Sequence, residues 1–230
     1  LDRSSAASDV YKRQALMYND LTLAFWLIVA GIVFDFFDGF VARLLHSSSA
    51  IGVQLDSLAD VITSGLAPAA VLWQVCLQTE PCWLPEGWKL GYGVFVLAAF
   101  SALRLAKFNI DETQTVEFCG LPTPAGSLLC ASLGMLWQQG MLALSSDGVL
   151  LVAVLTSLLL VSPIRMFALK FHGFGWRGNE VRYLFLLASI VLIIILRTYA
   201  IPVIIVLYIV VSAVRWLCMR SGNPDKAPKA

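Results

Sequence analysis

The chain has 230 residues, of which 59% are hydrophobic and only 13% are charged, and its mean hydropathy is +0.79. These values exclude an ordinary water-soluble domain, and the apolar residues fall into blocks near the length of about 20 residues that crosses a bilayer. The 16 Lys and Arg residues are balanced by 15 Asp and Glu residues, so we expect no basic surface of the size that nucleic acid binding requires. The sequence therefore predicts an integral membrane protein with no nucleic acid partner.

Seven apolar segments are predicted to be transmembrane helices, because lipid cannot hydrogen-bond an open backbone and no alternating barrel pattern is present. Short connections that contain Gly, Pro and Ser separate most of them. In chain order, the segments are 21–45, 51–78, 90–108, 123–144, 149–167, 181–196 and 201–219. The expected fold class is all-α, a polytopic transmembrane helical bundle with seven spans visible.

The first 14 residues, LDRSSAASDVYKRQ, have neither an initiator Met nor the apolar core of a signal peptide. We expect residues 1–14 to be a non-native leader, residues 15–219 to form the transmembrane domain, and residues 220–230 to be a cytoplasmic tail. If a native first helix is missing in the leader region, the number of spans is eight.

Basic residues near the ends of the predicted spans gather on one side of the membrane, and only Lys89 and Arg197 lie on the other side. The larger group consists of Arg43, Arg104, Lys107, Arg165, Lys170, Arg177, Arg182, Arg215, Arg220, Lys226 and Lys229. Such residues stay in the cytoplasm. The turn between the first two helices and the C-terminal tail are therefore expected on the cytoplasmic side of an inner or plasma membrane.

Four Asp residues lie in or at the edge of the first two apolar helices: Asp35, Asp38, Asp56 and Asp60. Unneutralised, they would cost on the order of 10 kcal/mol in a bilayer, so something must compensate them. The spacings i,i+3 and i,i+4 place each pair on one face of its helix. Since the two helices are joined by a short turn, they run antiparallel, and Asp35 is predicted level with Asp60 and Asp38 level with Asp56.

Four carboxylates at two matched levels form an all-oxygen cage, which suits the hard divalent cations Mg²⁺, Mn²⁺ and Ca²⁺. The lack of His or Cys at this level argues against zinc. Gly39, Ala42 and Gly52 leave the helix faces without bulk, so that a nucleotide and its phosphates could approach the backbone; the alternative is tight helix packing. Arg43 could bind a phosphate, or it could be a plain basic anchor at the cytoplasmic face.

The eight residues named in these helices fit the pattern D-x2-D-G-x2-A-R-x8-G-x3-D-x3-D, which resembles the signature of the CDP-alcohol phosphatidyltransferases. The resemblance implies the fold of that family and a homodimer. It also implies that Asp35, Asp38, Asp56 and Asp60 hold one or two divalent metals, with Asp60 as the general base. The CDP-lipid would bind at Gly39, Ala42, Arg43, Gly52 and Asp56.

Three flanking segments, residues 55–69, 102–109 and 118–126, resemble the phosphatidylserine synthases of the membrane-embedded type. This implies that CDP-diacylglycerol and L-serine are the substrates, that phosphatidylserine and CMP are the products, and that Mg²⁺ or Mn²⁺ is the cofactor, with Ca²⁺ as an alternative. Membrane lipids are the surrounding partners. A zwitterionic acceptor needs a cation for its carboxylate, and Arg104, Lys107 and Asn109 lie at the cytoplasmic end of the third span, where they could meet it. The alternative for Arg104 is a side chain that snorkels to the interface.

Two other functions fit parts of the pattern. A related transferase could use glycerol 3-phosphate or inositol phosphate as acceptor, because the eight-residue pattern does not name the alcohol. A divalent-cation transporter could also carry Asp residues within the membrane. Transport is disfavoured, because the Asp residues lie on helices that are predicted to be unbroken, near a cytoplasmic turn, and no internal repeat is visible.

Overall fold

The computed structural model describes residues 19–44, 50–82, 90–110, 117–167 and 179–222. The predictions for the leader 1–14 and for most of the tail 220–230 therefore lie outside the described residues. The elements, in chain order, are α2 (Leu21–Leu44), α3 (Ala50–Asp60), the π-helical turn η1 (Val61–Leu66), α4 (Ala67–Gln78), η2 (Leu90–Phe95), α5 (Val96–Ile110), β1 (Glu117–Cys119), α6 (Thr123–Gln138), α7 (Ser146–Leu160), β2 (Arg165–Phe167), α8 (Glu180–Leu196), η3 (Arg197–Tyr199) and α9 (Ala200–Gly222). The predicted helical class is confirmed.

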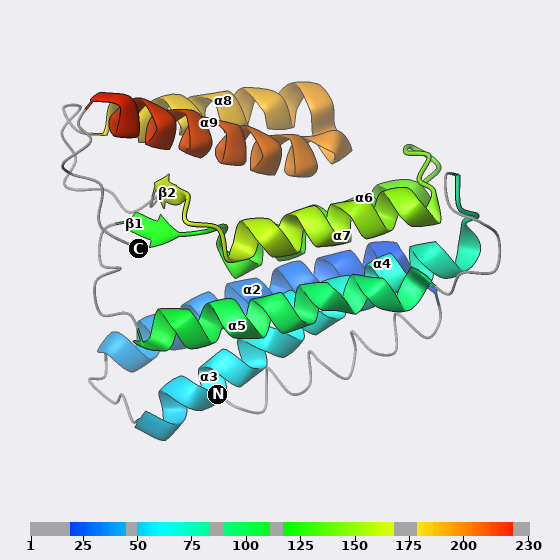
Figure 1. Cartoon of the computed structure of the whole chain (residues 1–230), viewed down its shortest axis with the longest axis horizontal. Coiled ribbons are helices and arrows are strands. Elements are labelled where there is room, and N and C mark those ends of the chain that lie inside the picture. The colour runs from blue at the N-terminus through cyan, green and yellow to red at the C-terminus, as the bar shows by residue number, and fades with distance from the viewer. Residues whose placement is uncertain (1–18, 45–49, 83–89, 111–116, 168–178, 223–230) are drawn as a thin grey trace.

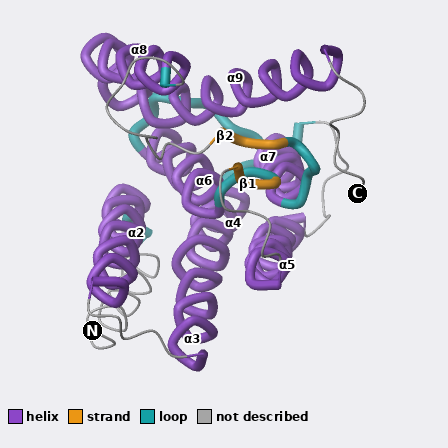
Figure 2. Tube along the Cα trace, turned by 90° about the vertical axis from the view of Figure 1, so that its left-hand side faces the viewer, coloured by secondary structure: helices purple, strands orange, loops and turns teal. Residues whose placement is uncertain are grey.

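The helices form a bundle with an additional hairpin on one side (Figure 1). Helix α6 packs against α2 and α4, and α5 packs against η1 and α7. Helices α8 and α9 contact each other and form a pair that covers the α6 side of the bundle, as both views show (Figures 1 and 2). The apolar core lies between these layers and includes the fully buried Phe25, Leu72, Leu97 and Leu136.

Each of the seven predicted segments contains a helix, but the count of seven spans is not confirmed. By length and composition, four stretches could cross a membrane: Leu21–Val41, Gln54–Gln78, Gly91–Ile110 and Glu180–Cys218. The last of these contains both α8 and α9, which meet at Arg197 with a φ of 49°. Helices α6 and α7 have 16 and 15 residues, which is shorter than the roughly 20 residues of a full span. The four stretches identify an integral membrane protein.

Two helix ends differ from the prediction. The fourth predicted segment, 123–144, is helical only to Gln138, and the fifth, 149–167, only to Leu160. The end of the fifth segment instead forms strand β2, which pairs antiparallel with β1, with Glu117 opposite Phe167 and Cys119 opposite Arg165. Pro163 lacks the amide donor that a helix needs at this point, so the chain leaves the helix after Leu160.

The connection between β1 and α6 is fixed by close contact with the end of α7. Gly120 N donates to Ile164 O at 2.9 Å, and Leu121 N donates to Leu159 O at 2.9 Å. Gly120 has a φ of +77°, and a Cβ atom at this position would collide with the Leu160 carbonyl oxygen. Only glycine combines this backbone conformation with so close an approach.

The hairpin of α8 and α9 is tied to the sheet through Tyr208. Its hydroxyl donates to Phe167 O at 2.9 Å, and its ring packs against those of Phe167 and Phe185 with centroid distances of 4.9 and 5.8 Å. The strand β2 therefore lies between the end of α7 and the outer helices.

We expect Gly120→Ala to destabilise the protein far more than Gly140→Ala. Gly140 also has a positive φ, +68°, but nothing lies within 4 Å of a Cβ atom built there. The control, Gly140→Ala, therefore measures backbone strain alone and should lower the free energy of unfolding by about 1–2 kcal/mol. Gly120→Ala adds the collision with Leu160 and should lower it by at least about 3 kcal/mol. Thermal unfolding in detergent measures both variants. Equal losses would show that contact with Leu160 does not fix this connection.

Candidate active site

The four Asp residues of α2 and α3 lie within electrostatic reach of one another. Asp56 interacts electrostatically with Asp38, and Asp35 is the strongest carboxylate influence on Asp60, ahead of Asp56 and Asp38. The strongest carboxylate influences thus join Asp38 with Asp56 and Asp35 with Asp60, which are the combinations that the distances from the turn predict. Asp56 is exposed, whereas Asp35, Asp38 and Asp60 are half-buried.

The carboxylates fit a divalent cation by the chemistry of their donors. The Oδ1 atom of Asp38 is buried and has no hydrogen-bond partner among the described residues, and such an oxygen requires a counter-charge or a donor. Carboxylate oxygens are the ligands that Mg²⁺ and Mn²⁺ prefer. Within the described ranges, no three His, Cys, Asp or Glu side chains already converge into a complete metal cage, so the ligands would have to draw together around the ion.

The predicted CDP-lipid residues lie on the same two helices. A Cβ atom built on Gly39 would have nothing within 4 Å, so helix packing does not account for this glycine. Gly52 is exposed on the first turn of α3. Both glycines therefore leave backbone accessible near the carboxylates. Ala42 and Arg43 belong to the last turn of α2, and their side chains lie outside the described part of the structure.

Arg104 approaches the carboxylates from α5. Its side chain is only 8% exposed, so the alternative of an interfacial snorkel is wrong. The guanidinium interacts electrostatically with Asp60 and with Tyr208, and its Nη1 atom donates to the Thr123 hydroxyl at 3.2 Å. A buried cation beside a cluster of carboxylates offsets part of their charge.

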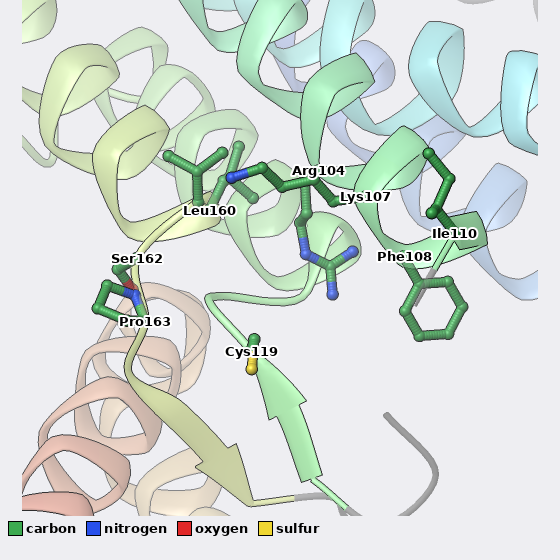
Figure 3. Close-up of a pocket in the computed structure, with 9 residues that line it drawn as sticks. Arg104, Lys107, Phe108, Ile110, Cys119, Leu160, Ser162 and Pro163 are labelled. Atoms are coloured by element: carbon green, nitrogen blue, oxygen red, sulfur yellow. The ribbon is translucent and has the colours of Figure 1, made fainter. Parts of the chain in front are cut away.

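A cavity of about 370 Å³ lies beside Arg104 (Figure 3). Its lining residues come from the end of α5, from β1 and from the connection between α7 and β2: Arg104, Lys107, Phe108, Ile110, Cys119, Leu160, Val161, Ser162 and Pro163. Figure 3 shows Arg104 and Lys107 extending from α5 on one side, with Cys119, Leu160, Ser162 and Pro163 on the other. Two of the three predicted acceptor residues therefore line one cavity.

Asn109, the third predicted acceptor residue, is not part of the cavity lining. Its Nδ2 atom donates to the Ser57 hydroxyl on α3 at 2.8 Å. The bond joins the ends of α3 and α5 next to the carboxylates. Asn109 thus contacts the helix of Asp56 and Asp60, and the structure assigns it a position between two helices.

The π-helical turn η1 directly follows Asp60 and was not foreseen, because we expected unbroken helices here. Such turns are frequent at functional sites. Gly65 lies in this turn, and a Cβ atom there would be 3.0 Å from Ser101 Cβ and 3.3 Å from Ala98 Cα. This small residue allows η1 to lie directly against α5, which brings Arg104 close to Asp60. The small residues Thr63, Ser64 and Gly65, shortly after Asp60, are the sequence signal from which this close approach could have been predicted.

Comparison with known proteins agrees with the geometry. The model of the CDP-alcohol phosphatidyltransferase family matches residues 10–164. The chain is 32% identical over 162 residues to the CDP-diacylglycerol--serine O-phosphatidyltransferase of Bacillus subtilis, covering 69% of this chain and 82% of that protein. It is 32% identical over 203 residues to the Helicobacter pylori protein of the same name, covering 85% and 80%, and 35% identical over 219 residues to that of Mycobacterium tuberculosis, covering 88% and 73%. The chain belongs to the CDP-alcohol phosphatidyltransferase family, whose members use divalent cations.

Proposed function

We propose that this protein transfers the phosphatidyl group from CDP-diacylglycerol to L-serine, with phosphatidylserine and CMP as products. The relatives that carry the name of this activity support the choice of serine. The observation that carries the proposal in the structure is the buried Arg104, which interacts electrostatically with Asp60 and lines a cavity with room for a small acceptor.

In the proposed reaction, the serine hydroxyl oxygen forms a bond to the phosphorus that bears the diacylglycerol. The bond between this phosphorus and the oxygen of the CMP phosphate breaks, and CMP leaves with the electron pair. The hydroxyl proton passes to the Asp60 carboxylate, which acts as the general base. Asp60 suits this role because it belongs to the carboxylate cluster and also lies within electrostatic reach of Arg104.

Asp35, Asp38, Asp56 and Asp60 are the proposed ligands of Mg²⁺ or Mn²⁺, with Ca²⁺ as the alternative. When bound, the cation would offset the negative charge of the diphosphate and of the leaving CMP. The accessible backbone at Gly39 and Gly52 supports an approach of the CDP-lipid to this face, to which Ala42, Arg43 and Asp56 are also assigned.

The proposed acceptor site is the cavity beside α5. Arg104 would bind the serine carboxylate, and Lys107, which is exposed and lines the same cavity, would add a second positive charge. In this proposal, the acceptor would lie between the basic end of α5 and the Asp60 carboxylate that takes its proton. We further propose an inner or plasma membrane location, an active site that faces the cytoplasm, and a homodimer.

Purified protein in mixed micelles should release CMP only when CDP-diacylglycerol, serine and Mn²⁺ or Mg²⁺ are all present. Asp60→Asn should lower this rate by about 10²- to 10⁴-fold, because the hydroxyl then lacks its base, while binding of the CDP-lipid is largely retained. Full activity of the variant would remove Asp60 as the base. CMP release driven by glycerol 3-phosphate or inositol phosphate instead of serine would refute the acceptor.

Asp38→Asn should weaken Mn²⁺ binding at least about tenfold, because a buried, otherwise unpartnered carboxylate oxygen becomes part of a neutral amide. Electron paramagnetic resonance of free Mn²⁺ measures this affinity without any turnover. The control is Glu180→Gln, which removes a single exposed carboxylate in the first turn of α8. Equal Mn²⁺ affinity in the wild type and in both variants would exclude Asp38 as a ligand.

A further inference from the structure

We propose that Thr123 is a positioning residue: its hydroxyl fixes the plane of the Arg104 guanidinium so that the edge formed by Nε and Nη2 is presented to a planar oxyanion. The inference deepens the proposed function and rests on it, because the oxyanion that the proposed reaction provides in this cavity is the carboxylate of serine.

The contact between the two side chains is buried. Arg104 is 8% exposed and Thr123 is 2% exposed, and the distance from Arg104 Nη1 to Thr123 Oγ1 is 3.2 Å. In such surroundings a hydrogen bond determines orientation, since little water competes for the donor. Arg104 Nε is buried and has no hydrogen-bond partner within the described ranges.

The choice of nitrogen matters for recognition. In a guanidinium, Nε and Nη2 share one edge and donate in parallel, which matches the two oxygens of a carboxylate. Thr123 engages Nη1, which lies outside this edge. The bond to Thr123 therefore holds the group without consuming the pair of donors that can bind a carboxylate at two points.

Thr123 itself is held on a rigid frame. It begins α6 between Pro122 and Pro124, whose rings restrict the backbone. Immediately before it, Gly120 and Leu121 donate backbone hydrogen bonds to the end of α7 and to the following connection. A β-branched side chain on a fixed backbone also has few rotamers. The hydroxyl is thus offered to Arg104 from a defined point.

Fixing the Arg104 guanidinium also keeps it from closing onto Asp60. The Asp60 carboxylate attracts Arg104, and an Arg104 drawn fully onto it would both block the base and turn its donors away from the cavity. The bond to Thr123 restrains one end of the guanidinium against this pull. Asp60 then remains available for the acceptor proton, and the Nε and Nη2 edge remains available for the acceptor carboxylate.

The test compares Thr123→Val, which keeps the shape and removes the hydroxyl, with Thr123→Ser, which keeps the hydroxyl. We expect Thr123→Val to raise the KM for serine about tenfold, with the KM for CDP-diacylglycerol changed less than about twofold, and Thr123→Ser to restore the wild-type value to within about twofold. A tenfold change corresponds to about 1.4 kcal/mol. Thr123→Ala is the second variant if Thr123→Val does not accumulate in membranes.

The matched control is Ser132→Ala on the same helix. Ser132 is fully buried, but its hydroxyl donates to the backbone oxygen of Leu129 at 2.8 Å. Loss of this hydroxyl should leave both KM values unchanged. If Ser132→Ala raises the KM for serine as much as Thr123→Val does, the effect reflects general packing of α6, and the inference is wrong.

A double-mutant cycle with Arg104→Lys tests whether Thr123 acts through Arg104. Lysine has no planar edge, so Arg104→Lys should raise the KM for serine by itself, and adding Thr123→Val should then change it less than about twofold. Multiplicative effects, or no rescue by Thr123→Ser, would overturn the proposal. A rise in the KM for the CDP-lipid alone would refute serine carboxylate as the ligand and assign the edge to a phosphate.

Failure of the proposed function would look different. The wild-type protein would then release no CMP in response to serine, whatever residue stands at position 123. In that case the same variants are compared with the alcohol that does support turnover. Coupling between Thr123 and Arg104 in the KM for that alcohol would support the positioning role, and its lack would refute it.

Discussion

The mutual repulsion of four carboxylates on two apolar helices is the constraint from which the site follows. Charges of one sign at this depth are not tolerated without compensation. Asp35 acts most strongly on Asp60, and Asp38 on Asp56, so the carboxylates of the two helices repel one another. We propose that compensation comes from a divalent cation and from the buried Arg104 on α5, which interacts electrostatically with Asp60.

Bringing Arg104 to that place requires several unusual local features. The π-helical turn after Asp60 and the small Gly65 let α5 lie directly against the segment that follows Asp60. Thr123, at the start of α6, accepts a hydrogen bond from the guanidinium. Near the end of the same helix α5, Lys107 lines the cavity and Asn109 donates a hydrogen bond to Ser57 on α3. A single helix thus serves the carboxylates, the cavity and the packing of the bundle.

The sequence predicted the features that depend on regular helices. Counting residues on either side of one turn predicted that Asp35 is level with Asp60 and Asp38 with Asp56, because the rise per residue of a helix is constant. Arg104 was expected at the cytoplasmic end of the third span, and in the structure it interacts electrostatically with Asp60. Residues 165–167 were misassigned to a helix, because an apolar stretch has the same composition in a helix and in a strand, and only the distant partner β1 decides between them. The bond from Asn109 to Ser57 and the position of Thr123 depend on contacts between segments that no local pattern encodes.

The hydrogen bond from Tyr208 to Phe167 connects the outer hairpin with the neighbourhood of the cavity. The region matched by the family model ends at residue 164, just before β2, so the outer hairpin of α8 and α9 lies outside that region. Yet the Tyr208 hydroxyl holds the strand that continues the cavity wall. A substitution in the outer hairpin that removes this hydroxyl would therefore also take away a support of the strand that follows residues 160–163 of the cavity lining.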